Sequence, residues 1–165
     1  MFIAHIPAGY LAASLFARKQ KNRRSVLAVG IVCSVLPDMD LLWFYLVDSR
    51  QVAHHNYIFH WPLYWLSLAL AGWIASWVLG HKGMRAYILV ALICLLLHTL
   101  LDSFAAEIYW FRPFSDIHLN VIEVPARYGW WVWNFVFHWT FTVELAFCFV
   151  AAIVYFRRKN DTGSA

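Results

Sequence analysis

Long apolar stretches without charged residues dominate the chain, and short polar connections separate them. Four of these stretches reach the length of about 20 residues that a helix needs to cross a bilayer, and a fifth, at the start, is shorter. In chain order they are Phe2–Ala17, Ser25–Val47, Tyr57–Leu79, Ala86–Ala106 and Trp130–Phe156. The pattern predicts an all-α integral membrane bundle of about five transmembrane helices. A four-span alternative treats Phe2–Ala17 as a surface helix.

Composition supports a membrane protein. The 165 residues are 62% hydrophobic and 13% charged, whereas a soluble domain carries about 25% charged residues. This composition excludes a disordered chain and argues against a soluble globule.

Basic residues gather after the first stretch, between the third and fourth, and after the fifth. They are Arg18, Lys19, Lys21, Arg23, Arg24, Lys82, Arg85, Arg157, Arg158 and Lys159. Cytoplasmic connections are enriched in Lys and Arg, so we expect the N-terminus outside and the C-terminus inside. One domain, residues 1–159, would then carry an outer cap over residues 107–129 and end in a short polar tail, residues 160–165.

Histidines and aspartates occur inside the predicted spans, where charged groups are costly and mark function. With the predicted orientation they fall within roughly 10 Å of the outer ends of four spans, at 1.5 Å of helix rise per residue. They are His5, Asp38, Asp40, His60, His98 and Asp102, with His54 and His55 just before the third span. Glu144 and His138, on the fifth span, are expected to form structural hydrogen bonds.

The spacing of these residues predicts which of them meet. His98 and Asp102 are four residues apart and share a helix face. Asp38 and Asp40 are two apart, nearly opposite on an intact helix, but Pro37 precedes them. We expect Pro37 to push Leu36 out of helical geometry and let both carboxylates turn inward.

A mixed set of imidazoles and carboxylates suits zinc, manganese or iron. The predicted ligands are His5, Asp38, Asp40, His55, His60, His98 and Asp102. More than four candidates suggest two divalent ions, with zinc favoured, as in sites that clamp a displacement at phosphorus. Asp40 is the candidate proton acceptor. Arg112, His54 and Trp110 are candidate substrate-binding residues.

The order of five short elements along most of the chain resembles the membrane-bound metal-dependent hydrolases, also described as LexA-binding, inner-membrane-associated hydrolases. The elements begin at His5, at Pro37-Asp38-Met39-Asp40, at His55 with His60 five residues later, at His98 with Asp102, and at Trp110 with Pro113-Phe114-Ser115. The resemblance implies a bacterial inner-membrane, metal-dependent hydrolase. Asn56 stands where the family pattern often has arginine, which leaves the substrate class open.

The residues and the resemblance together predict a multi-pass hydrolase of the bacterial plasma membrane, with its site towards the extracytoplasmic side. A phosphoester of a lipid or lipid-linked substrate is the expected target because the site would lie at headgroup depth. Membrane lipid is the expected partner, and no direct contact with nucleic acid is expected. The alternatives are a divalent-metal transporter, a haem-binding electron carrier and a non-catalytic membrane adaptor.

Overall fold

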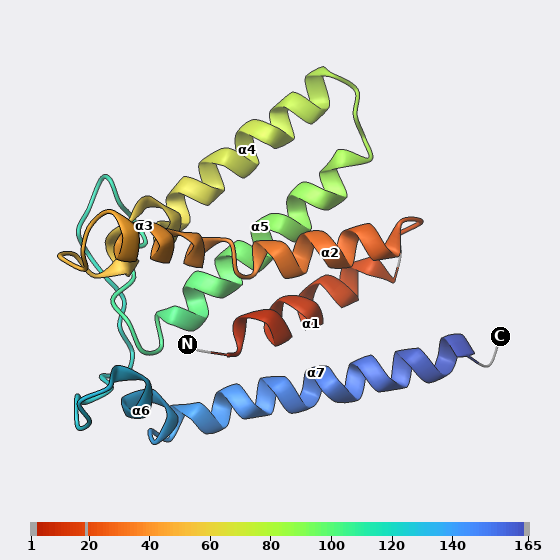
Figure 1. Cartoon of the computed structure of the whole chain (residues 1–165). Coiled ribbons are helices and arrows are strands. Elements are labelled where there is room, and N and C mark those ends of the chain that lie inside the picture. Colours follow the sequence, from red (N-terminus) through yellow and green to blue (C-terminus); the bar gives the residue numbers. More distant parts are fainter. Residues whose placement is uncertain (1–2, 19, 164–165) are drawn as a thin grey trace.

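The computed structural model describes residues 3–18 and 20–163 as helices joined by turns and one long connection (Figure 1). The elements are α1 (His5–Ala17), α2 (Arg23–Cys33), η1 (Pro37–Met39), α3 (Asp40–Leu46), η2 (His54–Asn56), η3 (Ile58–His60), α4 (Pro62–Val78), α5 (Met84–Asp102), α6 (Trp131–Val136) and α7 (Thr140–Gly163). These residues contain no β-strand, only an isolated bridge between Ile108 and Leu119. The predicted all-α class is confirmed. Phe2, Lys19 and the last two residues of the predicted tail lie outside the described residues.

Helices α1, α2 and α5 pack against one another and form the core. Its buried side chains are mostly small: Ala13, Ala17, Val26, Val90 and Cys94. Small residues let helix backbones approach closely where two apolar helices meet. Gly30 is a point of close helix approach in this core, since a Cβ built on it would lie 2.3 Å from the Cβ of Ala13.

The remaining helices extend this core. Helix α4 packs beside α5, and α7 packs beside α1. Figure 1 shows α4 and α5 as a hairpin and α7 as a long helix along the other side of the molecule. Large apolar side chains stay exposed on α4 and α7, among them Leu70, Trp77, Val78, Phe149 and Phe156. Helices that carry apolar groups on their outer surface are typical of a membrane bundle.

Among residues 3–18 and 20–163, two helices are long and apolar enough to cross a membrane, Met84–Asp102 and Thr140–Asn160. The bent pair Arg23–Cys33 with Pro37–Leu46 would add a third. The predicted third span is shorter than expected, because α4 begins only at Pro62 and has 17 residues. The predicted fifth span is interrupted between α6 and α7, and α7 continues into the predicted tail as far as Gly163. Five spans and the orientation of the termini stay predictions.

The predicted break near Pro37 is present, but its geometry differs from the prediction. The axis bends by 49° between the two helical pieces. Leu36 nevertheless keeps helical dihedrals, φ −60° and ψ −37°, so the prediction that it leaves helical geometry is wrong. Pro37 has no N–H to donate. At the break the backbone forms hydrogen bonds between residues three apart, such as Asp38 N–H to the carbonyl oxygen of Val35. Such 3-10 bonds tighten the helix instead of opening it.

The connections between the helices lie at two opposite ends of the molecule. Figure 1 shows that α1 and α4 begin, and α3 and α5 finish, at the same end. The α1–α2 and α4–α5 connections and the end of α7 lie at the opposite end. Most of the predicted ligands belong to elements that meet at the first end.

Replacing Gly30 tests the close packing of α1 on α2. We expect Gly30→Ala to destabilise the protein by about 1–3 kcal/mol, because overpacking a tight core forces backbone shifts. Gly83→Ala is the matched control, since a Cβ there meets nothing within 4 Å. Thermal unfolding in detergent measures both. Equal unfolding temperatures for the two variants would contradict the packing described here.

Candidate metal centre

Four side chains from three segments place one atom each around a common point. They are Asp38 in η1, His60 in η3, and His98 and Asp102 in α5. His98 Nε2 lies 3.0 Å from Asp102 Oδ2 and 3.4 Å from His60 Nε2, which is 3.6 Å from the same Asp102 oxygen. Asp38 Oδ1 lies 3.7 Å from His98 Nε2 and 3.9 Å from His60 Nε2. We call these four residues the His60–His98 cluster.

The spacing of the His60–His98 cluster fits a small divalent ion. Zinc binds imidazole nitrogens and carboxylate oxygens at about 2.0–2.2 Å in tetrahedral sites, which puts the ligand atoms about 3.3–3.6 Å apart. The five separations given above, 3.0–3.9 Å, lie around that range. The residues present therefore fit a four-coordinate metal in both donor type and spacing.

The second nitrogen of each cluster histidine is held by a hydrogen-bond acceptor. His60 Nδ1 donates to Asp40 Oδ2 over 2.6 Å, and His98 Nδ1 donates to the carbonyl oxygen of Ser34 over 2.8 Å. Carboxylate and carbonyl oxygens only accept, so these contacts place a proton on Nδ1, and in the neutral imidazole Nε2 then carries the lone pair. Metal-binding histidines in proteins almost always have such an outer partner.

When both imidazoles are neutral, the four facing atoms of the cluster all carry lone pairs. Two imidazole nitrogens and two carboxylate oxygens converge at these short distances, and His60, His98 and Asp102 are buried. Mutual repulsion of such atoms in a medium of low dielectric is costly unless a proton or a metal ion lies among them. The arrangement could therefore hold a cation, either a proton or a metal ion. Asp38, with its side chain 32% exposed, is its open side.

Local sequence explains how each ligand reaches this point. His98 and Asp102 occupy adjacent turns on one face at the end of α5. Pro37 starts η1 and turns Asp38 towards that face. Pro62 occupies the first turn of α4, where its missing N–H is no loss, so the chain before it forms η3 with His60 buried at its end.

Asp102 contacts two further predicted ligands. Its other oxygen, Oδ1, lies 3.1 Å from His5 Nε2, and the ring of His5 stacks on that of His98 with centroids 3.9 Å apart. His55 Nε2 lies 3.9 Å from Asp102 Oδ2. The first residue of α1 and the last residue of α5 therefore meet at the cluster.

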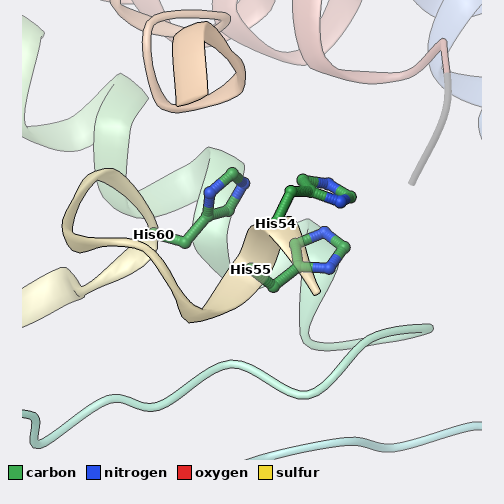
Figure 2. Close-up of side chains that lie close together, drawn as sticks. All are labelled: His54, His55 and His60. Carbon is green, nitrogen blue, oxygen red and sulfur yellow. The ribbon is translucent and has the colours of Figure 1, made fainter. Parts of the chain in front are cut away.

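His54, His55 and His60 form a second group whose ring nitrogens lie within 4.8 Å of one another. Figure 2 shows the rings of His54 and His55 side by side on the connection that also carries His60. Burial lowers the pKa of His54 to about 4 and holds the pKa of His55 well below its usual value. Both imidazoles are therefore neutral at pH 7, the form that binds metal.

Six of the seven predicted ligands thus lie in or against the cluster. The exception is Asp40, whose Oδ2 accepts from His60 Nδ1, the ring nitrogen that faces away from the cluster. Asp40 belongs to neither ligand group. The two groups share His60, whose Nδ1 is already bonded to Asp40. One His60 nitrogen cannot serve two ions, so the described geometry offers one complete four-ligand set. A second ion stays a prediction.

The predicted substrate-binding residues lie at the edge of the cluster. Arg112 Nη1 donates to the carbonyl oxygen of Asn56 over 3.4 Å, and its Nε pairs with Asp116 at 2.8 Å. Trp110 Nε1 donates to the hydroxyl of Ser103, directly after Asp102. The connection after α5 thus folds back towards the histidines. His54 is half-buried beside His55.

Glu144 on α7 stabilises the start of α1. Its carboxylate accepts hydrogen bonds from the backbone N–H groups of Ile3 and Ala4, immediately before His5. Sequence analysis predicted a structural hydrogen-bonding role for Glu144 but gave no partner. For His138 the contact is local, between Nδ1 and the hydroxyl of Thr140. Ser34 was missed, because it acts through a backbone carbonyl that any residue could supply.

Comparison with protein families identifies a relationship over almost the whole chain. A model of the family described as YdjM inner membrane protein matches residues 1–162. The chain belongs to this family. No curated protein and no solved structure matches the chain. Membership in the YdjM family agrees with the apolar helices and supports a location in the membrane, while its description names no reaction.

Asp40 can be tested as the residue that orients His60. We expect Asp40→Asn to weaken metal binding about 10- to 100-fold, as loss of such an outer partner commonly does, with the fold retained. Glu123→Gln, at an exposed acid, is the control. Competition with a chelating dye measures the affinity. An affinity for Asp40→Asn equal to that of the control would show that Asp40 does not support the site.

Glu144 can be tested as the group that holds α1 in place. We expect Glu144→Leu to leave the N–H groups of Ile3 and Ala4 without this acceptor and to raise amide exchange at the start of α1. Glu144→Gln keeps an acceptor oxygen and should behave closer to wild type, because its amide can still accept. Hydrogen–deuterium exchange with mass spectrometry measures the effect. Unchanged exchange in Glu144→Leu would contradict this role.

Proposed function

We propose that this chain is a metal-dependent hydrolase acting at the membrane surface on a phosphoester of a lipid or lipid-linked substrate. The observation that carries the proposal is the convergence of Asp38, His60, His98 and Asp102, with both histidines held through Nδ1. A divalent ion held there supplies Lewis acidity towards water and towards a phosphoryl oxygen. His5 and His55 contact Asp102 and would lie beside an ion held there.

The depth of the cluster supports a lipid substrate. His5 is the first residue of α1, Asp102 is the last of α5, and His60 precedes α4 by two residues. Ligands at the ends of apolar helices lie near the level of the lipid headgroups if those helices cross the membrane. In this proposal the site faces the extracytoplasmic side, because the basic connections lie at the opposite end.

The chain's own groups have distinct parts in this proposal. Asp38 is the partly exposed ligand and marks the side from which substrate approaches. Arg112 stands at the rim through its bond to Asn56 and supplies positive charge for a phosphate. Asp40 is a positioning residue here and no longer the proton acceptor, because its Oδ2 is engaged by His60.

Packing beneath the cluster argues against a metal transporter. A carrier needs a site with polar access from both sides of the membrane. Here Ala13, Ala17, Val26, Val90 and Cys94 fill the space between α1, α2 and α5 with apolar side chains. A hydrolase needs access from one side only, which Asp38 provides.

The test combines metal analysis with a lipid assay on the purified protein. We expect wild type to hold zinc, manganese or iron and to cleave at least one phospholipid or lipid-linked phosphate. His98→Ala combined with Asp38→Ala should lose the metal and reduce cleavage to the uncatalysed rate, because two of four ligands are gone. Elemental analysis and mass spectrometry of the lipids measure the two effects.

The matched control removes one histidine and one acid at exposed positions, His81→Ala with Glu123→Ala, and should keep both metal and activity. Full metal retention in the His98→Ala, Asp38→Ala variant would contradict the metal centre. A metal-loaded wild type that cleaves none of the lipid phosphoesters would contradict the enzyme and favour a non-catalytic adaptor.

A further inference from the structure

A second chemically distinct feature lies at the end of the molecule away from the His60–His98 cluster. A cavity of about 750 Å³ opens between the α1–α2 connection, the first turn of α2 and the last turns of α7. Figure 1 shows these segments at the end where α1 finishes and α7 ends. None of its lining residues is acidic, and half of them are basic. The basic residues are Lys21, Arg23, Arg24, Arg158 and Lys159.

The basic residues come from two segments far apart in the sequence. Packing of α7 on α1 brings them together: Arg158 Nη2 donates to the carbonyl oxygen of Ser14 over 2.9 Å. Tyr10 and Tyr155 meet edge to face beside the cavity, with centroids 6.3 Å apart. The cavity is therefore a product of the fold and not of a single basic run.

The charges around the cavity favour an anion. None of Lys21, Arg23 and Arg24 forms an ion pair with a described residue, and like charges held close together repel. The first turn of α2 also begins here, and the side chain of Asn22 does not cap it. A phosphate would relieve the repulsion through charge-assisted hydrogen bonds with the arginines and lysines.

We propose that this basic cavity binds a phosphate group, independently of the metal centre. Two sources share that chemistry, the headgroup of an anionic phospholipid and a soluble phosphate. Basic pockets at the cytoplasmic ends of membrane helices commonly hold anionic headgroups. The walls formed by Tyr10, Leu27 and Tyr155 would lie beside acyl chains and favour the lipid.

Binding to purified protein in a neutral detergent tests the proposal. Phosphatidylglycerol, phosphatidylcholine and inorganic phosphate are titrated separately, with native mass spectrometry and thermal shift as readouts. We expect phosphatidylglycerol to bind more tightly than phosphatidylcholine. Arg23→Gln combined with Arg24→Gln should weaken phosphatidylglycerol binding about 25-fold, since each basic residue near an anionic surface contributes a factor of about five.

Lys82→Gln combined with Arg157→Gln is the matched control, because it removes two charges at the same end from residues that do not line the cavity. It should bind as wild type does, and the metal content of both variants should stay unchanged, which reports intact folding. Inorganic phosphate that binds with the same variant dependence would identify a soluble phosphate as the source. Equal losses in the two variants, or no preference for either phosphate-bearing anion over phosphatidylcholine, would overturn the proposal.

Discussion

The buried carboxylate of Asp102 is the constraint on which the rest of the structure depends. It is 1% exposed at the end of an apolar helix, and both of its oxygens face imidazoles, His5 on one side and His60, His98 and His55 on the other. Removing a carboxylate from water costs several kcal/mol unless partners offset the loss. The chain supplies these partners from α1, the α3–α4 connection and α5 together, so the cluster ties the helix ends to one another.

Close packing of small residues makes this convergence possible. A Cβ on Gly9 would lie 2.3 Å from the Cβ of Ser34, so the missing side chain lets the end of α2 approach α1. Ser34 in turn supplies the carbonyl oxygen that orients His98. Glu144 holds the start of α1, and with it His5, against the same group of helices. Residues that are not themselves candidate ligands thereby determine where the candidate ligand atoms lie.

The sequence could predict that imidazoles and carboxylates gather at this end of the molecule. It could not predict which of them would face the candidate metal position and which would orient the others. Imidazoles and acids within apolar stretches are costly, which is why His98 and Asp102 stood out. The sequence could not show that Asp40 orients His60, because a carboxylate that binds a metal and one that holds a histidine look alike in sequence. The start of α4 at Pro62 was missed since the apolar pattern continues through η3, and the cavity at Arg23 and Arg158 requires tertiary packing that no local pattern reveals.

In the proposed site, two imidazoles and two carboxylates bind one divalent ion at the meeting point of these helices. X-ray absorption spectroscopy of the metal-loaded protein tests it most directly. We expect a coordination shell of nitrogen and oxygen atoms at about 2.0–2.2 Å, with the outer-shell scattering that two imidazole rings give. A shell that contains sulfur, or one without imidazole scattering, would contradict it.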